Sequence, residues 1–333
     1  MTRVFVTGTA GFIGYHLAEA LLAEGMVVHG YDGMTPYYDV GLKRARHARL
    51  ARHDRFTPTE AMLEDAGALR AAMDAAAPEV VVHLAAQAGV RYSVEAPRAY
   101  LDANVIGTFN VMEAARAHPV RHLMMASTSS VYGANTDMPF AETDKADLQM
   151  SVYAATKKAT ESMGHAWAHL NGVPTTMFRF FTVYGPWGRP DLALFRFVDA
   201  ILQGRPIDIY NHGQMYRDFT YVGDLVRALR LLMDTAPPPP GEAAAIEGDS
   251  LSPVAPFRIV NIGNSQKVRL MDFIEAIEAE LGREAIRNYM DMQPGDVPAT
   301  WADATLLRRL TGYAPQTDLR DGIAAFVAWF RDY

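Results

Sequence analysis

Tyr153 and Lys157 are the two side chains in this sequence best suited to move a proton together. They fall within Ser151–Leu170, a segment with a helical pattern, and positions i and i+4 lie on one face of a helix. A free phenol has a pKa of about 10 and is a poor base at neutral pH, but a nearby ammonium group lowers that pKa. Because this pair is also common on helix surfaces, it predicts chemistry only in the right context.

That context is a turn with three glycines near the start of the chain. Gly8, Gly11 and Gly14 follow the apolar run Val4–Val6, which is typical of a buried parallel strand, and a helical pattern begins after Gly14. Glycine lets the backbone approach a pyrophosphate, and the helix N-terminus offers free N–H groups. Asp32 ends the next apolar run about 20 residues later, as a dinucleotide-binding turn requires. A tight turn without a ligand is the alternative interpretation.

The two features predict one type of reaction. A nicotinamide held by this turn could take a hydride from a sugar carbon while Tyr153 takes the proton of its hydroxyl group. Thr128, which follows the predicted strand before the Tyr153 helix, could hydrogen-bond to the same oxygen. A carboxylate at Asp32 would repel the 2′-phosphate of NADP, so the predicted cofactor is NAD.

Apolar runs and helical segments alternate through the first half of the chain. This alternation predicts an α/β fold of the Rossmann type, a doubly wound parallel sheet that binds ligands at the carboxyl ends of its strands. The predicted strands are 4–6, 26–31, 79–84, 122–126 and 175–181, and the predicted helices include 64–76, 97–118 and 151–170. His83, at the end of one strand, is interpreted as a core residue because no second ligand stands at metal spacing.

Further segments are more irregular. The basic stretch Leu42–Arg52 is interpreted as a solvated helix, with Lys43 or Arg46 reaching the cofactor's adenosine side as the alternative. After Phe181, looser patterns predict helices at 192–203, 223–233, 270–281 and 318–330 and strands at 207–210, 217–221 and 257–262. The low-complexity stretch Pro237–Ser252 is interpreted as a surface loop without a catalytic role.

Composition excludes several classes of protein. The chain has 333 residues, a net charge of -7 and no long basic run, which argues against nucleic-acid binding. It has no cysteine, so disulfide and thiolate chemistry are excluded, and a reducing compartment fits. The chain enters its first strand at once, and no apolar run could span a bilayer, so we expect a cytoplasmic protein without a signal peptide or membrane partner.

With these residues in place, the sequence resembles an extended short-chain dehydrogenase/reductase of the nucleotide-sugar epimerase and dehydratase group. The resemblance covers nearly the whole chain. It rests on the segments TGTAGFIG, HLAAQAGVRYS, STSSVYG, YAATK, RFFTVYGPWGRPD, RDFTYVGD and QPGD. Within the group, PYYDVGLKRAR, AGVRYSVEAP and RFFTVYGPWGRPD look most like UDP-glucuronate 4-epimerases.

The resemblance implies tightly held NAD, a UDP-sugar substrate, no metal and a homodimer formed by the helices at 97–118 and 151–170. It also implies an NAD-binding domain at 1–180, to which later segments return, and a lobe at 181–333 that mainly binds the nucleotide sugar. The cofactor residues that it implies are Gly8, Gly11, Phe12, Ile13, Gly14, Asp32, Leu63, Ala85, Ala86, Gln87, Asn104, Ser127, Tyr153, Lys157 and Phe180. The implied catalytic residues are Tyr153, Lys157 and Thr128, and the implied substrate residues are Thr128, Tyr153, Thr182, Arg189, Arg217 and Asp296.

Two of these residues have alternative interpretations, and one further position departs from the family pattern. Arg217 could form an ion pair on a hairpin surface, and Asp296 could be a turn residue. Met62 stands where the family usually has an aspartate that binds the adenine, so the resemblance does not extend to recognition of the adenine by that side chain.

The residues after Thr128 help to choose the reaction. Related dehydratases carry Asp-Glu there and related decarboxylases a glutamate, whereas this chain has Ser129 and Ser130. Elimination therefore lacks its acid/base, and 4-epimerisation needs none beyond Tyr153. We expect UDP-glucuronate as the substrate. An epimerase or lyase acting on UDP-glucose or a dTDP-sugar, and a non-catalytic dinucleotide-binding module, are the alternatives.

Overall fold

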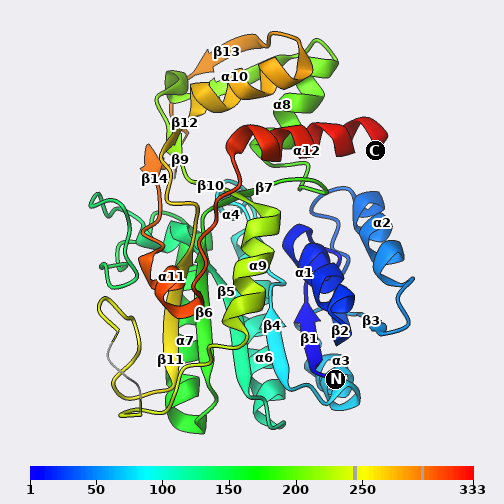
Figure 1. Ribbon diagram of the computed structural model, residues 1–333, viewed down its shortest axis with the longest axis vertical. Helices are drawn as coiled ribbons and strands as arrows, with labels where there is room; N and C mark the ends of the chain where they lie inside the picture. The colour runs from blue at the N-terminus through cyan, green and yellow to red at the C-terminus, as the bar shows by residue number, and fades with distance from the viewer. Residues whose placement is uncertain (243–245, 294–295) are drawn as a thin grey trace.

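A seven-stranded parallel sheet forms the centre of the computed structural model, which describes residues 1–242, 246–293 and 296–333 (Figure 1). Its strands run in the order β11-β6-β5-β4-β1-β2-β3. The predicted doubly wound Rossmann-type sheet is confirmed. The strand bounds are β1 (Arg3–Thr7), β2 (Val27–Asp32), β3 (Phe56–Glu60), β4 (Val80–His83), β5 (His122–Thr128), β6 (Thr175–Phe180) and β11 (Phe257–Ile262).

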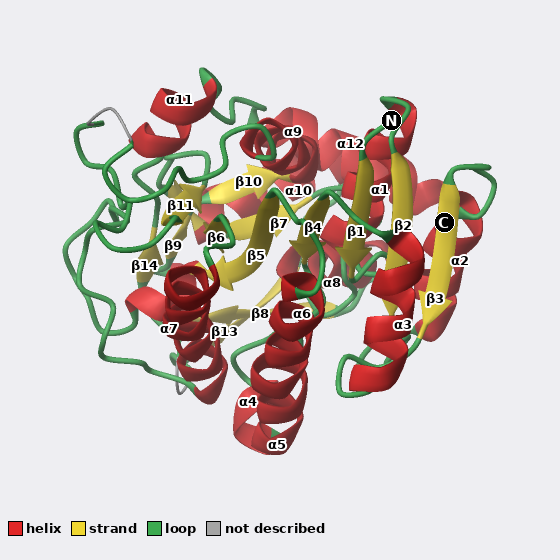
Figure 2. Cartoon of the chain, turned by 90° about the horizontal axis from the view of Figure 1, so that it is seen from below, coloured by secondary structure: helices red, strands yellow, loops and turns green. Residues whose placement is uncertain are grey.

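Helices cover both faces of this sheet (Figure 2). Val4 and Val6 of β1 pack toward α1 (Phe12–Ala23), α9 (Val222–Leu232) and α11 (Thr305–Thr311). Phe5, between them, packs toward α3 (Ala66–Ala76), α6 (Gly107–Arg116) and α7 (Val152–Asn171). This alternation follows from the period of two along a strand, and it places one apolar layer on each face.

One strand and one helix differ from the sequence prediction. The edge strand β3 was not predicted, because its sequence FTPTE contains Pro58 and few apolar residues. An edge strand tolerates proline, since one side of its backbone has no partner strand. The predicted helix 97–118 is instead three segments: α5 (Pro97–Tyr100), a π-helical stretch at Leu101–Ile106, and α6.

A smaller lobe lies above the carboxyl ends of the strands in Figure 1. Its core joins α8 (Ala193–Leu202), α10 (Leu270–Leu281) and α12 (Leu319–Asp332) around Ile209, Phe219 and Phe273. The short strands of this region are β7 (Thr182–Tyr184), β8 (Pro206–Tyr210), β9 (Tyr216–Arg217), β10 (Phe219–Tyr221), β12 (Val268–Arg269), β13 (Ile286–Met290) and β14 (Ala299–Thr300). Strand β11 comes from this later part of the sequence but joins the central sheet, where it pairs with β6.

The remaining α-helices of the described residues are α2 (Val40–Leu50) and the short α4 (Tyr92–Glu95), and 3₁₀ turns lie at Ser129–Tyr132 and Asn211–Gly213. No helix in the described ranges has the length and apolar character needed to span a membrane. The predicted loop at 237–252 is described except for residues 243–245, which lie outside the described residues.

The glycine turn after β1 is packed so tightly that a side chain is excluded at Gly14. A Cβ on Gly14 would lie 2.0 Å from the carbonyl oxygen of Gly8, and Gly8 itself has a φ of +81°. The Gly11 N–H donates to that same Gly8 oxygen at 2.9 Å. Gly14 therefore allows α1 to begin directly against the turn.

His83 lies in the core, as the sequence predicts. One ring nitrogen is 2.7 Å from the Thr7 hydroxyl oxygen, and the other is 2.9 Å from that of Thr108. Burial and, to a smaller extent, the charge of Lys157 lower the pKa of His83 to about 3. The ring is therefore neutral in the folded protein at every pH near neutrality.

We expect Gly14→Ala to lower the free energy of unfolding by about 2 kcal/mol or more, because the methyl group would overlap the Gly8 carbonyl. Gly67→Ala is the matched control in another helix. There the nearest atom to an added Cβ is an Asp65 carboxylate oxygen at 3.4 Å, so the change should be neutral or mildly stabilising. Urea unfolding of both variants measures the difference, and equal losses would contradict the prediction.

The second prediction concerns the effect of acid pH on the free energy of unfolding. Between pH 6.5 and 5.5 the unfolded chain binds a proton at His83 that the folded chain rejects, which costs about 1 kcal/mol of stability over that interval. In His83→Gln this contribution is absent, so the free energy of unfolding should fall less with acidification than in the wild type. Urea unfolding at the two pH values measures both slopes, and identical slopes would show that His83 titrates normally.

Candidate active site

One large cavity, of about 1060 Å³, opens between the carboxyl ends of the sheet strands and the smaller lobe. The ends of β1, β4, β5 and β6 contribute to its wall, which is where a doubly wound sheet binds ligands. All the residues implied for cofactor and substrate line this cavity, with the single exception of Asn104. The fold thus gathers residues that are up to 288 positions apart, from Gly8 to Asp296.

The glycine turn and Asp32 form one end of the cavity. Gly8, Gly11 and Gly14 line it beside the N-terminus of α1, so backbone N–H groups are available to an anion. The Asp32 carboxylate accepts hydrogen bonds from the Ala10 N–H at 2.9 Å and the Met34 N–H at 2.8 Å. These bonds fix an anionic group that fits the ribose hydroxyls of NAD and disfavours a 2′-phosphate.

Asn104 lies behind the cavity wall. Its side chain is fully buried; it accepts from the Gln87 N–H at 2.8 Å and donates to the Gln87 carbonyl at 3.0 Å. It also donates to the Thr156 hydroxyl at 3.1 Å, on α7. Asn104 therefore shapes the loop after β4 and connects it to the helix that carries Tyr153.

The basic helix α2 differs from the prediction of a solvated helix. Lys43 is 6% exposed and Arg46 is fully buried. Lys43 lines the cavity, and Arg46 donates to the carbonyl oxygen of Ala10 at 2.9 Å and that of Gly188 at 3.2 Å. The sequence pattern could not show this, because the partners are backbone carbonyls from distant loops.

Met62 lines the cavity at the position where the sequence departs from the family pattern. Its side chain is 43% exposed, and its sulfur lies where a Cβ on Gly33 would meet it at 2.6 Å. A thioether is only a weak hydrogen-bond acceptor. Met62 therefore does not reproduce the hydrogen bonds that a carboxylate at this position would accept from an adenine amino group.

Tyr153 projects from the first turn of α7 into the cavity. Ser151 caps this helix by accepting from the Ala154 N–H at 3.1 Å. Burial raises the pKa of the Tyr153 phenol, while a hydrogen bond with Thr128 and the charge of Arg189 lower it. Tyr100 packs edge-on against the Tyr153 ring, with a centroid distance of 6.0 Å.

Lys157 lies one turn further along α7 and is 3% exposed. Its ammonium donates to the Ala126 carbonyl of β5 at 2.8 Å. Burial lowers the pKa of Lys157 to about 8, and the charge of Glu161 opposes that decrease. Arg189 is the cation whose charge lowers the pKa of the Tyr153 phenol, and the expected effect of Lys157 on that phenol stays a prediction.

Arg189 lines the cavity and is paired within its own loop. Its Nε donates to Asp191 at 3.0 Å, and its Nη2 donates to the other Asp191 oxygen. The Tyr37 hydroxyl also donates to Asp191, at 3.2 Å. Asp191 therefore occupies one edge of the guanidinium, while Nη1 makes no protein hydrogen bond within the described ranges.

A second group of charged side chains lies at the opposite end of the cavity. Arg217 donates to the carbonyl oxygens of Tyr216 and Val297 at 2.8 Å each, so it is not the surface ion pair considered as an alternative. Asp296 accepts from Arg91 at 3.0 Å, and the Arg91 guanidinium lies 4.2 Å from the centre of the Tyr210 ring. Sequence reasoning gave Arg91 no role, because its partner lies 205 positions away.

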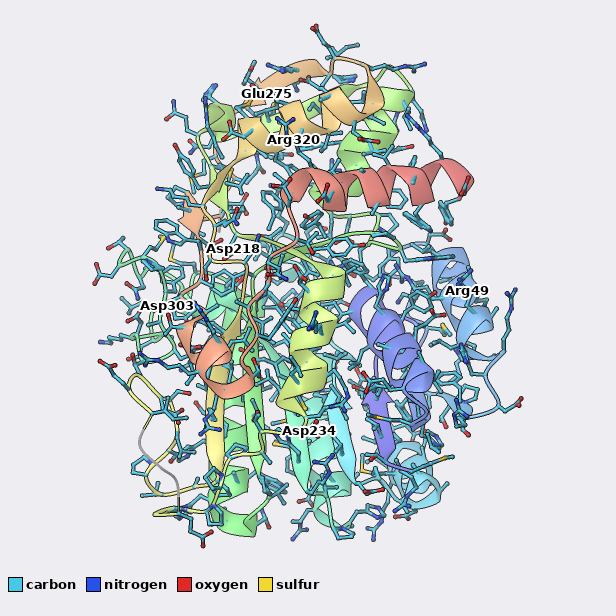
Figure 3. All side chains as sticks on the ribbon, viewed as in Figure 1. Arg49, Asp218, Asp234, Glu275, Asp303 and Arg320 are labelled. Carbon is cyan, nitrogen blue, oxygen red and sulfur yellow. The ribbon has the colours of Figure 1, made fainter. Side chains whose placement is uncertain are left out.

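Asp218 anchors this end of the cavity. Figure 3 places it between the sheet and the smaller lobe. Its buried carboxylate accepts from the N–H groups of Asn264 at 2.7 Å, Ser265 at 2.9 Å and Ala302 at 3.1 Å. Burial raises the pKa of Asp218 to about 6, and these hydrogen bonds oppose the increase. The neighbouring Arg217 is thereby held at the cavity wall.

Comparisons with known proteins agree with this geometry. A model of the NAD dependent epimerase/dehydratase family matches residues 4–245. The chain is 57% identical to a probable UDP-glucuronate 4-epimerase of Rhizobium meliloti, over 98% of this chain and 96% of the relative.

Solved structures are similar along the same length. UDP-glucuronic acid 4-epimerase from Bacillus cereus, in complex with UDP-glucuronic acid and NAD, superimposes with a TM-score of 0.88 at 30% identity over 99% of both chains. UDP-glucose 4-epimerase from Thermotoga maritima, with UDP-glucose, has a TM-score of 0.85 at 27% identity over 99% of this chain and 98% of that one. The chain belongs to the NAD-dependent epimerase/dehydratase family.

Proposed function

We propose that this protein is a UDP-glucuronate 4-epimerase that interconverts UDP-glucuronate and UDP-galacturonate. The observation that carries the proposal is the single cavity in which the glycine turn, Tyr153 and Arg189 meet. The similarity to epimerases of UDP-glucuronate supports the choice of sugar. The serines after Thr128, which line the same cavity, support epimerisation over elimination.

The residues at the ends of β1 and β4 would hold NAD, which when bound supplies the acceptor and donor of a hydride. Tyr153 takes the proton from O4 of the sugar and later returns it. Thr128 shares that oxygen and holds it near the phenol. Because hydride and proton both return, the enzyme ends unchanged and no external reductant is consumed.

Arg189 and Thr182 would hold the sugar carboxylate. Oxidation at C4 creates a β-keto acid, which loses carbon dioxide when the breaking bond aligns with the carbonyl π system. A guanidinium grips a carboxylate through two hydrogen bonds and so fixes its plane. We expect the Nη1 side of Arg189 to bind the carboxylate, since Asp191 already occupies the other edge.

A neutral sugar such as UDP-glucose is the second candidate substrate. The observation that favours it is the Asp191 carboxylate, which already neutralises Arg189. The similarity to a UDP-glucose 4-epimerase points the same way. Paired assays on the two sugars therefore belong to every test of this site.

We also propose a homodimer located in the cytoplasm. The helices α4, α6 and α7 lie on one side of the sheet (Figure 2). Apolar side chains are exposed on α4, the π-helical stretch, α6 and the start of α7, namely Val94, Leu101, Ile106, Phe109 and Val152. A second copy packed against this face would cover them.

The first functional prediction is the product. Wild-type protein given UDP-glucuronate should form UDP-galacturonate, identified by NMR, and Tyr153→Phe should lose nearly all turnover while retaining NAD, because only the acid/base oxygen is removed. Thr128→Ala should be affected less, since Thr128 orients but does not carry the proton. A keto or pentose sugar as the main wild-type product, or Tyr153→Phe activity within a few-fold of wild type, would refute the assignment.

The second functional prediction concerns Arg189. We expect Arg189→Ala to cost about 2–4 kcal/mol in kcat/KM for UDP-glucuronate, through lost charge-assisted hydrogen bonds. The loss on UDP-glucose, which has no carboxylate, should be much smaller, and residual turnover of UDP-glucuronate should give more decarboxylated product. Paired kinetics with product analysis provides the check. Equal losses on both sugars would show that Arg189 does not bind the carboxylate.

A further inference from the structure

Each of the last three residues of β5 interacts with a side chain on the same face of α7. The Ala126 carbonyl accepts from Lys157 at 2.8 Å, and the Ser127 hydroxyl donates to Glu161 at 2.6 Å. The Thr128 side chain lowers the pKa of the Tyr153 phenol. Positions 153, 157 and 161 are spaced four residues apart, so the three side chains form a row along one helix face.

Glu161 is the member of this row without a role in the proposed chemistry. Its side chain is 2% exposed and is paired with the equally buried Arg179 of β6, whose Nε and Nη2 donate at 2.9 and 2.8 Å. Lys158 adds a bond of 3.2 Å. A buried carboxylate costs much free energy unless it is paired and hydrogen-bonded, and here both of its oxygens have partners.

The placement of Glu161 has consequences for two cavity residues. The Ser127 hydroxyl donates its hydrogen bond to Glu161, so toward the cavity it can act only as an acceptor. Lys157 is a buried cation, and Glu161 is the anion whose charge favours its protonated form. His83 on β4 is neutral, with its pKa lowered in part by the charge of Lys157, and Arg179 on β6 is paired with Glu161.

We propose that Glu161 is a positioning residue of the reaction: anchored by Arg179, it orients the Ser127 hydroxyl and keeps the Lys157 ammonium charged beside Tyr153. The carboxylate touches no substrate and acts through these two neighbours. This inference rests on the proposed acid/base role of Tyr153, but it does not depend on which sugar is bound.

The direct test is the titration of Lys157. The chain has five lysines, so the side-chain carbons of 13C-lysine give few NMR signals, and the Lys157→Arg variant identifies the one that disappears. In Glu161→Gln we expect the Lys157 midpoint to fall by about one pH unit or more, since its counter-charge is lost and Arg179 stays charged. Lys158→Gln, which removes another partner of Glu161, is the matched control and should leave that midpoint within a few tenths.

Kinetics on the NAD-loaded protein provides the second measurement. A fall of one unit from about 8 removes more ammonium at pH 8 than at pH 6.5, so the loss of turnover in Glu161→Gln should be about fourfold greater at the higher pH. A folded variant with an unchanged Lys157 midpoint, or a loss that is equal at both pH values, would overturn the proposal.

A further variant covers the case in which Glu161→Gln fails to fold because Arg179 is left unpaired. In the double variant Glu161→Gln/Arg179→Gln both charges are removed. The Lys157 midpoint should then lie below that of the wild type, and a midpoint equal to the wild type would overturn the proposal. If the wild type does not epimerise UDP-glucuronate at all, the sugar assignment fails while the titration still decides the role of Glu161.

Discussion

The Arg46 guanidinium connects two segments of the cavity wall, the glycine turn and the loop that carries Arg189, and their relative position depends on it. It is completely buried, and within the described residues its partners are neutral: three backbone carbonyls, those of Ala10, Trp187 and Gly188, and the Tyr38 hydroxyl. Ala10 belongs to the glycine turn, and the other two carbonyls belong to the loop that carries Arg189. A single buried cation thus sets the distance between the dinucleotide turn and the loop proposed to bind the sugar carboxylate.

Buried ions recur around this cavity, and each is held in its own way. Arg179 and Glu161 neutralise each other, whereas Asp218 is stabilised by backbone N–H groups from three segments. Such groups are costly to leave unpaired, so each fixes the relative position of the elements that supply its partners. Polar contacts between elements therefore position parts of the cavity wall, although many of its residues stand on loops.

Local patterns in the sequence predicted the sheet, the glycine turn and the Tyr153–Lys157 pair, because these depend on short-range signals, whereas most other candidate site residues were implied only by the family resemblance. Apolar runs marked the central strands, and the glycine spacing with Asp32 marked the first turn. The strand β3 escaped because Pro58 and polar neighbours hide an edge strand, and the π-helical stretch around Asn104 escaped because its residues have an ordinary helical pattern. The ion pair between Arg91 and Asp296 depends on two segments that only the folded chain brings together.

The pairing of β11 with β6 has a consequence for how the chain folds during its synthesis. Strand β6 ends at Phe180, but its neighbour β11 begins only at Phe257, so more than seventy residues must emerge before the sheet is complete. Until then β6 is an open edge with unpaired backbone groups, which other chains could join. The helix α7, with its catalytic candidates, also packs against β11, since His165 contacts the Phe257 ring. A ribosome-bound chain that stops before β11 would therefore carry every proposed proton-transfer residue while its sheet still lacked one edge.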